Sequence, residues 1–291
     1  IFNSNLQPVL LALIFFNINL FSYSNNKLNS FHFIGRDSYG TIFFPISYFL
    51  LAGLFWDYPY HITASFLILA IADPIASIIG KNNKKNKTYN ILGDQKSLEG
   101  STAMFLCSSI IISLMSKLIF INLPIGYQII GILYTSLAVT IAEGLSYKGS
   151  DNLTIPITAF LFIELFNHIN RIDFTFEYLF IINIIILLLF LFYIKKHLSI
   201  SGFIGSSLMA ILLFGYGGND YIYPIITFFI TSSILSIIKK QETKIKKSNR
   251  SIKQVYANGG IALFICILNY FFNHSLMYPC FLASVAAANS D

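Results

Sequence analysis

Residues 73–101 contain the densest group of side chains suited to binding a phosphate. The segment reads DPIASIIGKNNKKNKTYNILGDQKSLEGS and is flanked by long apolar runs. Asp73 lies near the end of the first run, and a charge in a membrane helix is costly enough to indicate a functional site. Cations are supplied by five lysines, Lys81, Lys84, Lys85, Lys87 and Lys96. Because Gly80, Gly93 and Gly100 also allow close backbone approach, the segment predicts binding of an anionic, phosphate-containing ligand.

The spacing of these residues excludes a P-loop. That motif requires a glycine, four further residues and then Gly-Lys-Ser or Gly-Lys-Thr. Gly80-Lys81 is preceded by Ile75 where the first glycine should stand. Lys96-Ser97 lacks a glycine at the required position as well. Any nucleotide must therefore be bound in a different way.

A second polar group lies at residues 142–156, AEGLSYKGSDNLTIP. Glu143 ends one apolar run, and Asp151 and Asn152 precede the next. In the simpler interpretation, Asp151 or Asn152 caps a helix and Glu143 reaches the membrane interface. In the other interpretation, these residues join Asp73 as oxygen ligands for Mg²⁺, which takes a few carboxylates together with substrate phosphates.

The composition indicates an integral membrane protein. The chain is 55% hydrophobic and 11% charged, with a mean hydropathy of +0.68, whereas soluble domains carry about 25% charged residues. The net charge of +6 resides in short loops, which favours a membrane-orientation signal over nucleic-acid binding. Cys107, Cys266 and Cys280 lie in apolar segments without metal-ligand spacing, so we expect ordinary buried or lipid-facing thiols.

The hydrophobic pattern predicts an all-α, polytopic membrane protein with about 10–11 transmembrane helices. We expect helices at residues 8–24, 41–56, 59–80, 101–121, 125–146, 153–167, 178–194, 199–216, 221–238, 259–272 and 276–289. If the basic loop after residue 80 is cytoplasmic, most other lysines and arginines fall on the same side. Both polar groups described above then share that cytoplasmic face.

The predicted arrangement of helices across the membrane also places a few other residues. Tyr39, Trp56 and Tyr89 are expected to be aromatic residues at the membrane interface. His61 and Glu164 lie toward the opposite face and are given no role.

Four blocks resemble the polytopic polyprenol kinase family, which includes phytol kinase, dolichol kinase and CTP-dependent diacylglycerol kinase. The blocks are RDSYGTIFFP (36–45), ADPIASIIGK (72–81), KSLEGSTAMF (96–105) and EGLSYKGSDNLTIP (143–156). The resemblance covers about residues 30–195. It implies a prenol kinase-like membrane domain at residues 1–196.

A second resemblance follows residue 196. SGFIGSSLMAILLFGYGG (201–218), KQVYANGGIA (253–262) and ASVAAANSD (283–291) are similar to the uncharacterised integral membrane family that includes phytyl-phosphate kinase. We expect residues 197–291 to be the N-terminal part of such a domain, which would continue beyond Asp291. Its site candidates are Asn258, Asn289 and Asp291.

The first resemblance implies transfer of the γ-phosphate of a nucleoside triphosphate, with CTP favoured over ATP, to an isoprenoid alcohol such as phytol or to another lipid alcohol. The second implies a further phosphorylation of the prenyl monophosphate. Catalysis of such a transfer consists mostly of positioning and charge neutralisation.

The site residues follow from the matched blocks. Asp73, Glu143 and Asp151 would hold Mg²⁺ directly or through water, Asn152 would orient them, and Asp73 would accept the proton of the alcohol. The nucleotide and its phosphates would be contacted by Lys81, Lys96, Ser97, Glu99, Gly100 and Ser101, the last four through hydroxyl groups or a helix N-terminus.

Three other interpretations remain open. A phosphatidate cytidylyltransferase would share the nucleotide and magnesium chemistry but attach CMP to the lipid. A transporter would use Asp73 and Glu143 as a cation relay, although such folds favour an inverted repeat that these halves do not display. The second half could also be a structural or assembly element.

Overall fold

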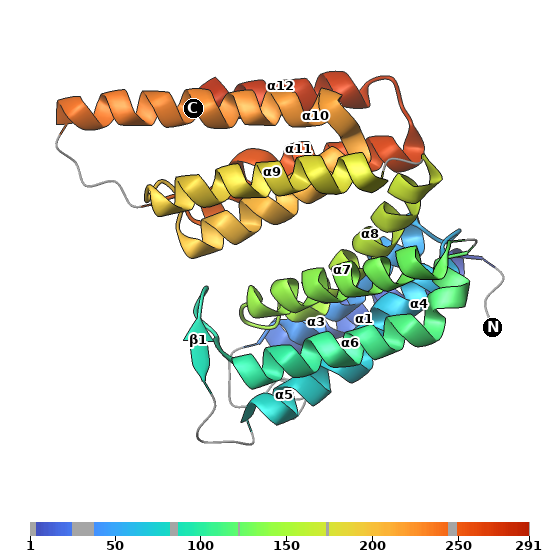
Figure 1. Ribbon diagram of the computed structural model, residues 1–291. Helices are drawn as coiled ribbons and strands as arrows, with labels where there is room; N and C mark the ends of the chain where they lie inside the picture. Colours follow the sequence, from blue (N-terminus) through green and yellow to red (C-terminus); the bar gives the residue numbers. More distant parts are fainter. Residues whose placement is uncertain are drawn as a thin grey trace. The chain divides into compact units, whose positions relative to one another are not determined.

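The computed structural model describes residues 4–24, 38–81, 87–121, 123–172, 175–243 and 249–290, with only the backbone described over 233–243. The chain forms two compact units, Ile1–Phe166 and Asn167–Asp291 (Figure 1). Within the described residues, eight helices are long and apolar enough to cross a membrane. The predicted all-α membrane class is therefore confirmed.

The first unit contains most of the helices that carry the predicted site. In chain order they are α1 (Leu6–Ser24), α3 (Gly40–Leu54), α4 (Pro59–Leu67), the π-helical turn η1 (Ile68–Ala72), α5 (Asp73–Lys81), α6 (Leu98–Ile119), α7 (Ile125–Gly144) and α8 (Asp151–Arg171), the last of which runs past the end of the unit. α1 packs on α3, and α6 packs on both α5 and α7. Aromatic side chains fill the core, where Phe160 stacks on Phe55 with ring centroids 4.7 Å apart.

The second unit contains α9 (Thr175–Ile194), α10 (Ile200–Thr243), α11 (Ile252–Phe272) and α12 (Met277–Ser290). α10 is interrupted at Gly218, whose φ of 61° lies in the left-handed region. Glycine adopts that conformation at little cost. The interruption falls between the two helices predicted at 199–216 and 221–238, so the sequence located this break correctly.

The eleven predicted apolar segments all correspond to helical stretches of the structure, but the start of one helix was misplaced by seven residues. α11 begins at Ile252 rather than at residue 259, because Ser251 and Gln254 form a capping box that extends the helix into a polar stretch. α3 is apolar but too short to be counted among the eight helices that could cross a membrane. The domain boundary predicted at residue 196 separates two sequence resemblances, whereas the compact units are defined by packing. The division into compact units therefore does not test that boundary, which stays a prediction.

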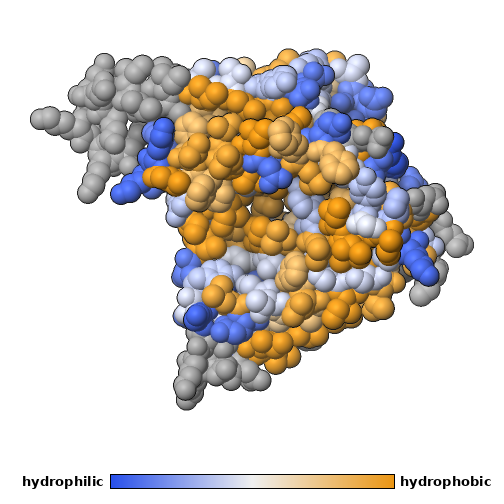
Figure 2. Space-filling view, viewed as in Figure 1, coloured by the Kyte–Doolittle hydropathy of each residue, from blue (hydrophilic) through white to orange (hydrophobic). Residues whose placement is uncertain are grey.

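Large apolar side chains cover the surface, as expected for contact with lipid. Phe176 and Phe180 on α9 are 78% and 70% exposed, and Figure 2 shows hydrophobic residues over much of the visible face. Soluble monomers rarely expose contiguous apolar patches larger than a few hundred Å². The exposed faces of these helices are therefore suited to the acyl chains of a bilayer.

The first unit also contains a buried pair that was given no role from the sequence. His61 Nε2 on α4 lies 3.2 Å from Glu164 Oε2 on α8, and the two side chains are 11% and 1% exposed. The His61 ring packs against Phe160 and Tyr58. The pair therefore joins two helices in the core.

Replacing His61 with leucine is expected to destabilise the protein by about 3–5 kcal/mol, because the buried Glu164 carboxyl loses this partner. The double variant His61→Leu/Glu164→Leu should recover much of that loss, since it buries no charge. Thermal unfolding in detergent would measure both. Equal melting temperatures for the wild type and His61→Leu would show that the pair contributes nothing to stability.

Asp73 directly follows a local widening of its helix. η1 joins α4 to α5 and ends at Ala72, and Pro74 comes one residue after Asp73. Proline has no N–H to continue the helical ladder. Single π-turns inside α-helices are often found at functional sites. The irregular backbone here positions a half-buried acid near the end of a membrane helix.

α5 and α6 cross closely at two glycines. A Cβ atom on Gly100 would lie 3.0 Å from the Ala76 carbonyl oxygen and 3.4 Å from Gly80 Cα. Gly100 therefore sets the helix crossing, which is a different task from the predicted contact with phosphate.

Replacing Gly100 with alanine should cost about 1–3 kcal/mol of stability, because the helices must separate to accept the methyl group. Gly126→Ala on α7 is the matched control, since nothing lies within 4 Å of its added Cβ. That control should be neutral or slightly stabilising. Melting temperatures in detergent would test the pair, and equal values for both variants would contradict the close crossing.

Residues 87–97, expected to be loop, contain a short hairpin. β1 (Thr88–Asn90) pairs antiparallel with β2 (Gln95–Ser97). Gly93 in the connecting turn has a φ of 126°, a conformation that favours glycine. The hairpin ends where α6 begins, so it delivers Lys96 to the start of that helix.

Candidate active site

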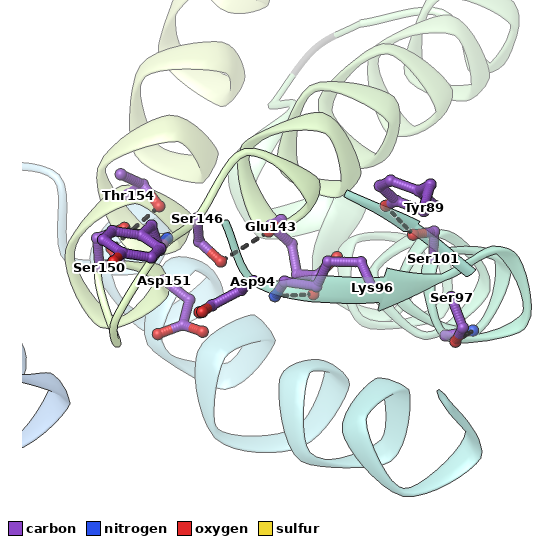
Figure 3. A network of polar contacts seen from close by, with 12 residues as sticks. Tyr89, Asp94, Lys96, Ser97, Ser101, Glu143, Ser146, Ser150, Asp151 and Thr154 are labelled. Atoms are coloured by element: carbon purple, nitrogen blue, oxygen red, sulfur yellow. Dashed lines mark hydrogen bonds and ion pairs between the residues drawn. The ribbon is translucent and has the colours of Figure 1, made fainter. Parts of the chain in front are cut away.

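Lys96 and Glu143 form an ion pair at the centre of the site (Figure 3). Lys96 Nζ on β2 donates to Glu143 Oε1 at the end of α7. Their side chains are only 16% and 9% exposed. Two residues far apart in the chain are thus brought together by the hairpin and by the end of a membrane helix.

The hairpin is held against the helices by contacts from β1 and from the connecting turn. The Tyr89 and Ser101 hydroxyl oxygens are 2.7 Å apart, and a Cβ on Gly144 would lie 2.8 Å from the Tyr89 hydroxyl. The Lys148 N–H donates to Asp94 Oδ2 at 3.0 Å. These contacts fix the strand that carries Lys96.

Asp94 and Tyr89 were not predicted as site residues. Tyr89, expected at the membrane interface, is half-buried against the end of α7, and burial raises the pKa of its hydroxyl. The only local signal was the Gly93-Asp94 pair, which is typical of a turn. Asp94 and Tyr89 hold the hairpin in place and so position Lys96.

The turn before α8 orients a second acid. The backbone N–H and the side-chain Nδ2 of Asn152 donate to Asp151 Oδ1 at 3.0 and 3.1 Å. Nδ2 also donates to the Gly149 carbonyl at 3.3 Å. Because α8 begins at Asp151, neither residue occupies the N-cap position, so the simple capping interpretation is not what this geometry supports.

Three acids surround Lys96. Burial alone would lower the pKa of Lys96, but Glu143, and then Asp151 and Asp73, raise the pKa above its ordinary value. The lysine therefore stays protonated at neutral pH. We refer to Asp73, Lys96, Glu143 and Asp151 as the charged cluster.

The charged cluster carries more negative than positive charge. In the part of the chain that the structure describes, neither Asp73 nor Asp151 forms an ion pair, and Glu143 Oε2 is buried without a hydrogen-bond partner. Lys81 acts on Asp73 electrostatically from the exposed end of α5. Buried charges are normally paired or coordinate metals, so the cluster is suited to a further cation.

A three-carboxylate metal site is not formed by these side chains. Among the described residues, no three acidic, histidine or cysteine side chains lie close enough together to hold one ion. Mg²⁺ needs fewer protein ligands, because it keeps several waters and is bound by one or two carboxylates plus substrate phosphates. The donor set therefore fits Mg²⁺ in that form, with Asp73 and Asp151 as the acids that lack an ion pair.

The other predicted phosphate ligands mostly have structural partners. Ser97 Oγ accepts from the Gly100 N–H at 3.1 Å and caps α6. Ser101 is bonded to Tyr89. Glu99 Oε1 accepts from the Lys87 N–H at 3.3 Å, and its Oε2 is buried without a partner among the described residues. Lys84 and Lys85 lie outside the described residues.

The candidates of the second unit do not form a recognisable cluster. Asn258 is exposed on α11. Asn289 Oδ1 on α12 accepts from Thr231 Oγ1 at 3.1 Å. Asp291 lies outside the described residues.

Comparisons with known proteins agree with both resemblances. Residues 183–291 match the model of the family described as Integral membrane protein DUF92. The chain is 32% identical to a phytol kinase from Synechocystis sp. over 146 residues, 48% of this chain and 60% of that protein. It is also 36% identical over 116 residues to an uncharacterised membrane protein of Methanocaldococcus jannaschii, 38% of this chain and 48% of that protein.

The chain thus spans 60% and 48% of the lengths of these two relatives. No solved structure matches it. Together with the eight apolar helices, the family match supports a multi-pass integral membrane protein.

Proposed function

We propose that the first unit is a membrane lipid kinase, which transfers the γ-phosphate of a nucleoside triphosphate to an isoprenoid alcohol such as phytol. Similarity to a phytol kinase supports the reaction class. The observation that carries the proposal is the charged cluster, in which a buried, protonated lysine lies among three acids near the end of a membrane helix. CTP is our favoured donor, with ATP as the alternative.

The residues of the charged cluster and two of their neighbours have distinct tasks in this proposal. Lys96 neutralises the transferring phosphoryl group, and Glu143 holds its ammonium in place. Asp73 accepts the proton of the alcohol. Asn152 fixes the Asp151 carboxylate. Lys81, at the exposed end of α5, binds the outer phosphates of the nucleotide.

Magnesium would be held by Asp73 and Asp151 together with the phosphates of the nucleotide. When bound, it would neutralise the negative charge of those phosphates. Without it, the excess negative charge of the cluster would repel the nucleotide. The remaining chemistry falls to Lys96 and Asp73.

The location of the site suits the substrate. A prenyl tail partitions into the bilayer at about 0.8 kcal/mol per CH₂ group, and its hydroxyl stays at the interface. Asp73 lies near the end of an apolar helix, where such a hydroxyl would be found. We propose that this end faces the cytoplasm, because the basic loop follows it.

The reaction class can be tested with two labels. Membranes containing the chain would be incubated with Mg²⁺, phytol or geranylgeraniol, and either γ-labelled or α-labelled CTP, with γ-labelled ATP in parallel. We expect label in the lipid phase only from the γ-labelled donor, in a monophosphate ester. Incorporation from α-labelled CTP with phosphatidate would instead indicate a cytidylyltransferase, and incorporation from no donor would favour a transporter.

The second predicted domain, residues 197–291, is proposed to act on the monophosphate that the first unit makes. Its match to an integral membrane family and its resemblance to phytyl-phosphate kinase support this order of steps. In the same assay, we expect a labelled lipid diphosphate that appears later than the monophosphate, as evidence of this second phosphorylation.

A further inference from the structure

Tyr147 is an exposed aromatic residue near the charged cluster, and the proposed chemistry leaves it unused. It lies in the turn between α7 and α8, shortly after Glu143, and is 41% exposed. Its backbone is fixed, because the Tyr147 N–H donates to Ser150 Oγ at 2.9 Å. The next residue, Lys148, is fixed as well, since its carbonyl accepts from the Tyr39 N–H at 2.9 Å. The turn therefore holds an aromatic ring at the surface in a defined place.

The ring of Tyr147 lies against the tip of the hairpin. A Cβ atom on Gly93 would lie 2.8 Å from Cε2 and 3.1 Å from Cδ2 of that ring. The ring thus packs on backbone that carries no side chain, and Lys148 Nζ lies 5.5 Å from the ring centre. An aromatic residue that only anchors a protein at the membrane interface needs no such fixed support. The packing therefore favours a binding role for the ring.

Asp94 presents a carboxylate at the same hairpin tip. Its Oδ2 accepts from the Lys148 N–H at 3.0 Å. In the part of the chain that the structure describes, its Oδ1 accepts no hydrogen bond, so one oxygen remains for a ligand. Asp94 is two residues from Lys96, which is at most about 7 Å of extended chain, and in the view of Figure 3 it lies between Asp151 and Lys96. A nucleotide with its phosphates on Lys96 therefore has its base within reach of this turn.

A fixed aromatic ring and a carboxylate oxygen are the two groups that a nucleobase with an exocyclic amino group needs. Bases stack on aromatic side chains through their flat faces. The amino group of cytosine donates to an aspartate or glutamate carboxylate. Uracil carries an oxygen acceptor at that position, which a carboxylate would repel. The pair of side chains thus discriminates CTP from UTP.

We propose that Tyr147 and Asp94 form the base subsite of the nucleotide donor, with the base stacked on the Tyr147 ring and its exocyclic amino group donating to Asp94 Oδ1. The inference rests on the proposed function, because it takes the nucleotide phosphates to bind at the charged cluster. It extends that function by naming the side chains that select the donor.

The stacking contact can be measured by equilibrium dialysis of labelled CTP and Mg²⁺ against the full chain in phosphatidylcholine nanodiscs, without lipid alcohol. Tyr147→Leu keeps an apolar side chain on Gly93 but loses the aromatic face, so CTP should bind about 5- to 150-fold more weakly. Tyr147→Phe should bind within about threefold of the wild type. Tyr60→Leu is the matched control, because Tyr60 is 47% exposed near the start of the span Pro59–Lys81, and it should have no effect.

Competition by inorganic tripolyphosphate separates stacking from damage to the site. This probe has no base, so it should displace a nucleotide from Tyr147→Leu at the same concentration as from the wild type. Melting temperatures would confirm that the variant is folded. CTP binding within twofold of the wild type in folded Tyr147→Leu would overturn the inference, as would an equal loss of tripolyphosphate binding.

Asp94→Asn tests the hydrogen bond to the base. Asparagine keeps an oxygen for the Lys148 N–H, and its amide N–H can donate to the uracil oxygen. The ratio of CTP affinity to UTP affinity should therefore fall at least about tenfold. Asp57→Asn, at an exposed aspartate in the turn before α4, should leave that ratio within twofold. An unchanged ratio in folded Asp94→Asn would overturn the inference.

These measurements fail separately from the test of the proposed function. If CTP binding depends on Tyr147 and Asp94 but no lipid is phosphorylated, the base subsite stands and the kinase proposal falls. If a prenyl alcohol is phosphorylated but both variants bind nucleotides as the wild type does, the kinase proposal stands and the base subsite falls. Absence of any CTP binding would overturn both.

Discussion

Replacing Asp73 with asparagine is expected to slow phosphate transfer to a prenyl alcohol by about 100- to 10,000-fold, the usual contribution of a general base. Asparagine keeps the size and polarity of the side chain but cannot accept the proton. The lost charge also weakens magnesium binding, so the magnesium concentration needed for half-maximal rate should rise. Initial rates in nanodiscs at varied alcohol and magnesium concentrations would measure both effects.

Asp57→Asn is the matched control for this variant. Asp57 is exposed in the turn just before the start of the same membrane span, Pro59–Lys81. Its replacement should leave the rate within twofold of the wild type. Wild-type turnover by Asp73→Asn would refute the assignment of this acid, whereas equal losses in both variants would point to a general effect on the protein.

Replacing Lys96 with alanine is expected to have two effects. The variant should lose about 3 kcal/mol of stability, because Glu143 is left buried without its ion-pair partner. Phosphate transfer should fall at least about 100-fold, the usual cost of losing one group that stabilises transition-state charge. Lys117→Ala, at an exposed lysine in the last turn of α6, should do neither.

A double-mutant cycle separates these two effects. Glu143→Gln removes the buried charge, so adding Lys96→Ala to it should cost little further stability. If Lys96 contacts the phosphate, the double variant should still be about 100-fold slower than Glu143→Gln alone. Equal rates for those two variants would mean that Lys96 serves only to neutralise Glu143.

The helices were predictable because a bilayer dictates their length and apolar composition. The break at Gly218 was predictable as well, since the polar residues around it interrupt an apolar run. The start of α11 was misplaced because its first turns are polar, and only the capping interaction of Ser251 with Gln254 reveals that they are helical. The hairpin at β1 and β2 was missed because its strands are too short to display a period of two.

The site was predictable in outline and not in detail. Threading the helices placed Asp73, Glu143 and Asp151 on one face, and the structure brings all three around Lys96. The pairing of Lys96 with Glu143 depends on how the hairpin folds back, which no local pattern records. For the same reason, Ser101 was assigned to phosphate although it bonds to Tyr89.

The pair of His61 and Glu164 illustrates the opposite error. A histidine and an acid in separate apolar helices gave no sequence signal of their proximity, so both were left without a role. Their contact in the core follows from the packing of α4 on α8. For charged residues in different membrane helices, a structure is therefore needed to distinguish pairs that stabilise the core from residues of a functional site.

The central claim is that the nucleotide phosphates bind at the charged cluster of the first unit. Crosslinking with a CTP analogue that carries a photoreactive group on its γ-phosphate, followed by mass spectrometry of the peptides, would test it most directly. We expect crosslinks in residues 87–101 and 142–152 that unlabelled CTP or ATP suppresses. Crosslinks confined to the second unit, or unaffected by competing nucleotide, would contradict the account.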